Sequence, residues 1–234
     1  MPPPDHHEHG HRDVTGGWLR PSVFGLVDGL ASNFALIAGV AGAGVPPRTV
    51  ALTGVAGLVA GAFSMATGEY ISVASQSELT RAEIDNERAE LRRSPEAEQA
   101  ELAQVYVARG VEPELAREVA RQMSVDPDQA LAIHVREELG VDAEDLPSPY
   151  LAAGSSFVAF AIGALIPALP YLLGASNLLL SLVLSALALF ASGALVSRFT
   201  GRPALYTGAR QLLFCGGAAA VTYLVGHLVG AGVA

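Results

Sequence analysis

The sequence predicts an all-α membrane protein with five transmembrane helices and a helical cytosolic insert between the second and third. Three observations predict this class. Of the 234 residues, 51% are hydrophobic. Residues 76–146 hold 18 of the 23 carboxylates, together with 8 arginines. On both sides of this acidic segment, apolar runs of about 20 residues are long enough to cross a hydrocarbon core. Such segregation of charge is typical of an integral membrane protein with one soluble insert.

One continuous helix is expected to lead from the membrane into the insert. Residues 50–61 are apolar or small, and no helix breaker occurs between Gly61 and Glu90. Beyond Ser77 the carboxylates recur at helical spacing. A single helix is therefore predicted to join a lipid environment to an aqueous, acidic one.

The remaining boundaries follow from composition and turn residues. We expect residues 1–17 to be a disordered, histidine-rich tail, 18–76 to hold transmembrane helices 1 and 2, 77–146 to form the insert, and 147–234 to hold transmembrane helices 3 to 5. The tail carries His6, His7, His9 and His11. These histidines are expected either to bind metal weakly or to have no role.

Arginines indicate the orientation. Arg12, Arg20, Arg198, Arg202 and Arg210 flank the spans on the side of the insert, whereas Arg48 stands alone on the other side. The positive-inside rule then places the N-terminus and the insert in the cytosol. The chain has no lysine. Together with its compact size, this favours a bacterial plasma membrane. An acidic chain gives no reason to expect nucleic acid as a partner.

Proline and glycine divide the insert into helices. Helix starts are expected at Ser94-Pro95, Glu112-Pro113 and Asp126-Pro127, and helix ends at Gly110 and Gly140. Apolar stripes predict one small shared core, made of Leu102, Val105, Tyr106, Leu131, Val135 and Leu139.

Carboxylates in the insert form like-charged pairs that lack arginine partners. Such pairs destabilise a helix by about 0.2–0.5 kcal/mol each. They flank the apolar stripes, so a polynuclear cation site of hard oxygen ligands plus one imidazole is predicted, suited to Fe²⁺, Mn²⁺ or Zn²⁺. The alternative is a solvated acidic face. The predicted metal ligands are Glu87, Glu90, Glu98, Glu101, His134 and Glu138.

Three residues in the expected spans are candidates for an ion path. A charge such as Asp28 at the centre of a span costs about 2.5–3.5 kcal/mol, so it should face a cavity, a partner or an ion. Met65 and Glu69 lie one helical turn apart and combine a thioether with a carboxylate. Glu69 could instead pair with a flanking arginine. Glycines spaced by four residues predict close helix packing, between subunits or within one.

Two segments carry a family resemblance. "FGLVDGLASNFALIAGVAGAG" and "GAFSMATGEYISVASQSE" resemble the signatures of the vacuolar iron transporter family, and the similarity extends from about Trp18 to the end. The resemblance implies a homodimer of five-span subunits that exports Fe²⁺, and often Mn²⁺, from the cytosol in exchange for protons. It also places Asp28 and Met65 on the pathway, Glu69 in the second signature, and the five glutamates Glu87, Glu90, Glu98, Glu101 and Glu138 on the ligand positions. His134 departs from the family's plant members, which carry methionine there.

The function expected from the sequence is therefore proton-coupled transport of divalent metal ions, with the ions as substrate and with no prosthetic group or enzymatic activity. Two alternatives remain. One is a membrane-anchored protein that binds or sequesters metal without moving it. The other is a di-iron oxidase, although its usual Glu-x-x-His pattern fails here because Leu131 stands three residues before His134. The single cysteine, Cys215, rules out both an internal disulfide and a multi-thiolate metal site.

Overall fold

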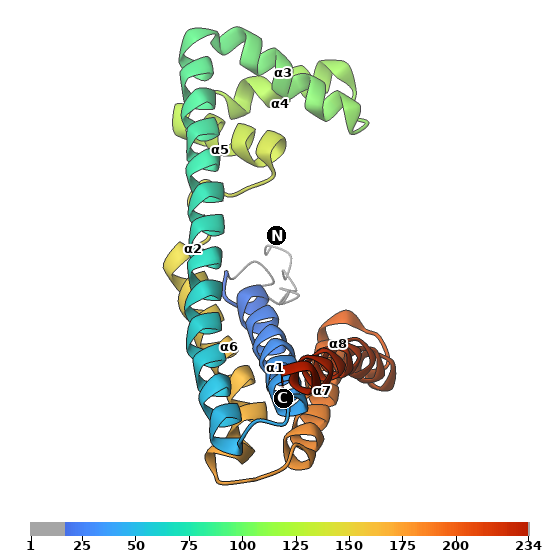
Figure 1. Ribbon diagram of the computed structural model, residues 1–234. Coiled ribbons are helices and arrows are strands. Elements are labelled where there is room, and N and C mark those ends of the chain that lie inside the picture. Colours follow the sequence, from blue (N-terminus) through green and yellow to red (C-terminus); the bar gives the residue numbers. More distant parts are fainter. Residues whose placement is uncertain (1–16, 234) are drawn as a thin grey trace, which may run out of the picture. The chain divides into compact units, whose positions relative to one another are not determined.

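The computed structural model describes residues 17–233, and every regular element among them is a helix (Figure 1). The predicted all-α class is thus confirmed. The expected tail falls outside the described residues except for Gly17. The described chain divides into two compact units. One contains the residues up to Ile71 and those from Pro149 onward, and the other runs from Ser72 to Ser148.

Five helices are long and apolar enough to cross a bilayer, which confirms the predicted number of spans. They are α1 (Leu19–Gly42), α2 (Pro47–Arg93), α6 (Pro149–Leu172), α7 (Leu179–Thr200) and α8 (Ala204–Val233). The 47 residues of α2 correspond to about 70 Å of helix, far more than a hydrocarbon core of about 30 Å. Its apolar first half is therefore the span. The charged residues beyond Ser72 belong to the other unit.

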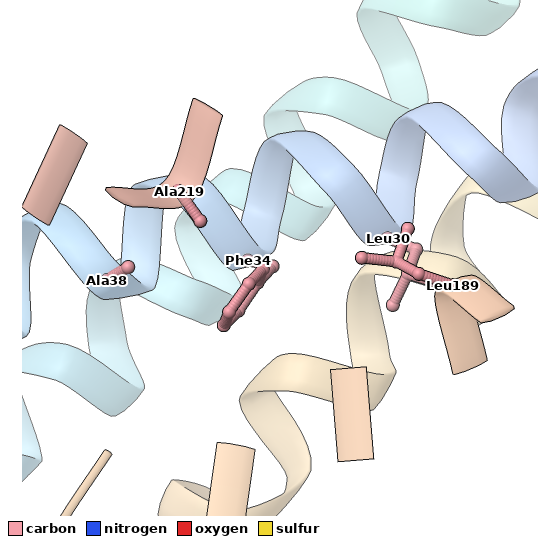
Figure 2. Close-up of a cluster of buried hydrophobic side chains, with 5 residues drawn as sticks. All are labelled: Leu30, Phe34, Ala38, Leu189 and Ala219. Atoms are coloured by element: carbon pink, nitrogen blue, oxygen red, sulfur yellow. The ribbon is translucent and has the colours of Figure 1, made fainter. Parts of the chain in front are cut away.

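Helix α1 lies at the centre of the first unit and contacts α6, α7 and α8. Figure 2 shows part of this core, in which Leu30, Phe34 and Ala38 of α1 meet Leu189 of α7 and Ala219 of α8. A second cluster joins α2 to α6 through Ala62, Phe160 and Ala164. Apolar packing therefore holds each of the five spans to at least one other.

A buried asparagine ties three of the spans together. The Nδ2 atom of Asn33 on α1 donates to the carbonyl oxygen of Gly54 on α2 at 3.1 Å and to that of Ala164 on α6 at 2.6 Å. In hydrocarbon, an unpaired side-chain N–H group is costly. Asn33 thus serves as a cross-link between helices through both of its amide protons.

The glycines spaced by four residues pack helices of the same chain against one another. Gly25 and Gly29 lie against the backbone of α6 so closely that a Cβ at either position would collide with it. Gly57 lies against the Asn33 side chain, and Gly61 against the ring of Phe160. Small residues of this kind allow helix backbones to approach. These four glycines therefore account for packing inside the subunit.

The second unit contains the end of α2 and the helices α3 (Pro95–Ala108), α4 (Pro113–Met123) and α5 (Pro127–His134), which continues as the π-helical turn η1 (Val135–Leu139). All three expected helix starts are correct. Asp126 caps α5 by accepting from the amides of Asp128 and Gln129. Gly110 and Gly140 both adopt positive φ, at 94° and 67°, which a chain reversal requires and glycine tolerates.

The apolar core of this unit is split in two. Ile84, Leu131 and Val135 form one cluster, and Leu102, Ala103 and Ala120 form the other. The predicted single core is therefore wrong, and Leu139 remains 39% exposed. The reason is that the two stripes face different helices: Leu131 and Val135 pack against Ile84 of α2, whereas Leu102 packs with Ala120 of α4.

Candidate metal centre

His134 is the last residue of α5, and its side chain is fully buried. Its Nδ1 atom lies 3.0 Å from Oε1 of Glu87 and 3.1 Å from Oε1 of Glu138. An oxygen of Glu98 lies 3.9 Å from the same nitrogen. The imidazole therefore faces three carboxylates, which come from α2, α3 and η1.

These four side chains offer one ligand atom each, and the four atoms all lie within 4.8 Å of one another. An octahedral ion with bonds of about 2.1 Å holds opposite ligands about 4.2 Å apart. A contraction of a few tenths of an ångström would thus bring all four atoms into one coordination shell. Glu87, Glu98 and His134 are buried, whereas Glu138 is open to solvent and gives the group an exposed side.

The group is poor in hydrogen-bond donors. A neutral imidazole carries one N–H, so it cannot satisfy three carboxylates through Nδ1. Oε1 of Glu87 and Nε2 of His134 are both buried and lack a hydrogen-bond partner within the described chain. A buried acceptor without a donor is costly, and a divalent cation among the carboxylates would offset that cost at Oε1 of Glu87 by direct coordination.

The carboxylates are also perturbed electrostatically. Burial, followed by the nearby charges of Glu138, Glu98 and Glu90, raises the pKa of Glu87 to about 7, and His134 offsets part of the effect. Burial likewise raises the pKa of Glu98, with Glu101 as the next cause. Both shifts show that negative charge is concentrated at this point of the insert.

Two of the predicted ligands do not enter the group. Glu90 and Glu101 are exposed and lie at its edge, where they act on Glu87 and Glu98 through space. Glu101 therefore does not turn toward the core as the stripe pattern suggested. Its neighbour Leu102 occupies the buried position instead, at 1% exposure.

Sequence reasoning missed a polar cluster beside the group. The Tyr106 hydroxyl lies 3.5 Å from Oε1 of Glu137 and 3.5 Å from Sδ of Met123. Arg109 pairs with the other carboxylate oxygen of Glu137. Glu137 is next to Glu138 in the sequence, and adjacent residues of a helix point in different directions, so the two side chains meet different partners. The contacts of Tyr106 and Arg109 with Glu137 join α3 and the residue after it to η1, and no spacing within one helix predicts them.

The three intramembrane candidates occupy separate environments. Asp28 is half-buried on α1. Met65 is half-buried on α2 and packs against the Phe160 cluster. The Ser32 hydroxyl, one turn after Asp28, donates to the backbone carbonyl of Asp28 at 2.6 Å.

Glu69 is 8% exposed and has a basic neighbour. A guanidinium nitrogen of Arg20 lies 3.7 Å from its Oε1 atom, while the Arg20 side chain is 82% exposed. The flanking-arginine partner considered from the sequence is thus present. Such a contact with an exposed cation is weak, about 0–1 kcal/mol.

Comparison with known proteins places the chain in a family. The sequence model of the VIT family matches residues 19–227. A vacuolar iron transporter of Acanthamoeba castellanii is 38% identical over 220 residues, which are 91% of this chain and 78% of that protein. Vacuolar iron transporter 1 of Arabidopsis thaliana is 33% identical over 200 residues, 84% of this chain and 80% of that protein. Because the match covers four candidate membrane helices, most of the fifth and the segment between the second and third, the chain belongs to the VIT family.

Proposed function

We propose that the protein moves Fe²⁺, and also Mn²⁺, out of the cytosol in exchange for protons, with the insert collecting the ions. The observation that carries this proposal is the group of Glu87, Glu98, His134 and Glu138 in a chain with five candidate spans. Hard carboxylate oxygens with one imidazole suit Fe²⁺, Mn²⁺ and Zn²⁺. The relatives named as iron transporters favour iron among these. The ion is substrate, and no prosthetic group or enzymatic step is part of the proposal.

The proposed path through the membrane uses Asp28, Met65 and Glu69. Asp28 supplies a carboxylate that can exchange a proton for a cation. Met65 supplies a soft sulfur ligand. Glu69 holds an exposed arginine at 3.7 Å, and an arriving cation would displace it. In this scheme protons and metal ions compete for the same oxygens, which provides the coupling.

We place the N-terminus and the insert in the cytosol. Arg20, Arg198 and Arg210 flank the spans on that side, and Arg48 lies on the other. The location in a bacterial plasma membrane stays a prediction. The relatives described above do not support it, because they are eukaryotic proteins named for the vacuole. A homodimer is expected from the family resemblance. The glycine pairs do not support a homodimer, because their close contacts are with helices of the same chain.

The test is flux in liposomes. Full-length protein is reconstituted around a metal-quenched fluorophore, and Fe²⁺ is added outside with a reductant. Uptake should require the protein and should accelerate when the lumen is acidic. Asp28→Asn should abolish uptake because it removes the cation partner and the proton site. Ser32→Ala, one turn away on the same face of α1, should leave uptake unchanged and serves as the matched control.

The outcomes separate the alternatives. Metal binding without uptake would assign the protein to sequestration, for which the buried ligand group alone would be sufficient. If the uptake rate does not change with the proton gradient, the protein is a metal transporter without proton coupling. A di-iron oxidase has little support, because the ligand group contains one imidazole whereas the usual pattern has two.

A further inference from the structure

Glu137 on η1 is held by two side chains from the end of α3. Its carboxylate pairs with the guanidinium of Arg109, the residue directly after α3, and its Oε1 atom lies 3.5 Å from the Tyr106 hydroxyl. The Glu137 side chain is 18% exposed. A carboxylate so far removed from solvent is costly unless donors reach it, and a charged donor is the stronger kind. Glu137 therefore depends on α3 for its partners.

The same side of α3 carries the ligand Glu98. Glu98, Leu102 and Tyr106 follow one another at intervals of four residues, which places them along one side of the helix. Leu102 is 1% exposed, and Tyr106 packs against its cluster. An oxygen of Glu98 lies 3.9 Å from Nδ1 of His134. Helix α3 therefore meets the segment formed by α5 and η1 at two points, one at His134 and the other at Glu137.

A helix held at two points can neither slide nor turn freely. Glu101 lies three residues after Glu98, so an exchange of their positions requires α3 to shift by about 4.5 Å along its axis and to turn by about 60°. Such a movement would separate Arg109 and Tyr106 from Glu137. The contact at the end of α3 therefore favours the register in which Glu98 is buried and Glu101 is exposed.

We propose that Arg109 and Tyr106, by holding Glu137, set the register of α3 and so select Glu98 over Glu101 as the ligand from that helix. Arg109 and Tyr106 are positioning residues, since neither is one of the four side chains of the ligand group. The inference rests on the proposed role of the insert in collecting metal ions. It goes beyond that role because it identifies the contact that decides which of two neighbouring glutamates binds the ion.

Calorimetric titration of the full-length protein with Mn²⁺ in mild detergent tests the role of Arg109. By charge alone, Arg109→Gln removes a positive charge from an acidic domain and should tighten the binding of a cation. The register role predicts the opposite sign: the Kd should rise about tenfold, a usual result when a residue that orients a ligand is lost. Arg109→Lys keeps a cation for Glu137 and should restore most of the affinity. Arg117→Gln is the matched control, because Arg117 is an exposed arginine that pairs with Glu114 within α4, and its Kd should not rise.

A double-mutant comparison separates positioning from a general loss of structure. In the wild-type background, Glu98→Gln should raise the Kd for Mn²⁺ about tenfold, and Glu101→Gln should raise it much less. In the Arg109→Gln background, the cost of Glu98→Gln should fall and that of Glu101→Gln should rise, because either glutamate can then reach the ion. Arg109 and Glu98 are eleven residues apart, about 16 Å along the helix, so their effects should be additive if the register does not change.

The outcomes are distinct. Arg109→Gln that binds Mn²⁺ as tightly as wild type, or more tightly, would overturn the register role, and so would additive effects of Arg109→Gln and Glu98→Gln. If Arg109→Gln does not fold, Tyr106→Phe keeps the ring and removes only the hydroxyl; it should also raise the Kd, and an unchanged Kd would overturn the role. These results leave the collecting role of the insert intact, because the wild type still binds. A wild type that does not bind Mn²⁺ would overturn both roles together.

Discussion

The Nδ1 atom of His134 lies 3.0 Å from Oε1 of Glu87, a contact between the last residue of α5 and the charged half of α2. Glu138 competes for the same nitrogen at 3.1 Å. One imidazole proton can serve only one of these carboxylates well. The insert therefore buries more negative charge at this point than its own donors can balance, and a bound cation would balance it.

Replacing the imidazole should weaken metal binding. We expect His134→Ala to raise the Kd of the full-length protein for Fe²⁺ or Mn²⁺ about tenfold or more, because it removes the only nitrogen ligand of the group. Isothermal titration measures this. His227→Ala is the control, since His227 is an exposed imidazole on α8. Unchanged affinity in His134→Ala would remove His134 from the ligand set.

The metal-free protein should lose stability as pH rises. The folded-state pKa of Glu87, about 7, lies above its ordinary value of 4.5, so the folded state binds this proton more tightly than the unfolded state. The stabilising effect of the proton is complete below about pH 4.5 and is lost between about pH 4.5 and 7. Glu87→Gln keeps the size and removes the charge, so its melting temperature should exceed that of wild type at pH 8.

The matched control for this measurement is Glu83→Gln, an exposed residue one turn earlier on α2. It should melt like wild type at both pH 5 and pH 8. Adding metal at a hundredfold excess over Kd should stabilise wild type by about 2.7 kcal/mol at pH 8. If the metal-free Glu87→Gln protein melts at a lower temperature than wild type at pH 8, the charge of Glu87 does not destabilise the fold.

Under the proposed mechanism, the sulfur of Met65 should distinguish Fe²⁺ from Mn²⁺. Met65→Ala removes the thioether and also opens space beside Phe160, against which Met65 packs. Met65→Leu restores most of the volume without sulfur and isolates the ligand role. We expect both variants to lower Fe²⁺ uptake more than Mn²⁺ uptake, because the harder ion depends less on sulfur. If the leucine variant transports both ions normally, Met65 is a packing residue.

Local signals in the sequence were sufficient for most of the fold. Apolar runs, Asp126-Pro127 and the two glycines at positive φ determine helix positions through interactions within a few residues, so these could be predicted. Local signals could not predict which glutamates contact His134. Glu98 and Glu101 are one turn apart, and the choice between them depends on how α3 packs against two other helices. The pairing of Glu137 with Tyr106 and Arg109 is also set by tertiary packing.

The last prediction distinguishes two glutamates on α3, both of which the sequence predicted to be metal ligands. Glu98 is buried in the ligand group, whereas Glu101 is exposed at its edge. Glu98→Gln removes one direct oxygen charge. We therefore expect it to slow uptake into liposomes several-fold at low Fe²⁺ and to spare uptake at saturating Fe²⁺, where collection by the insert is no longer limiting.

Glu101→Gln should have a smaller effect at low Fe²⁺, because Glu101 acts on the group only through space and solvent screens exposed charges. Raising the salt concentration should therefore erase the effect of Glu101→Gln and leave most of the effect of Glu98→Gln. The measurement is the initial uptake rate for each variant over a range of Fe²⁺ and salt concentrations. Equal losses in the two variants at high salt would mean that the group binds its ion with Glu101 as a direct ligand, in an arrangement of α3 different from the one described here.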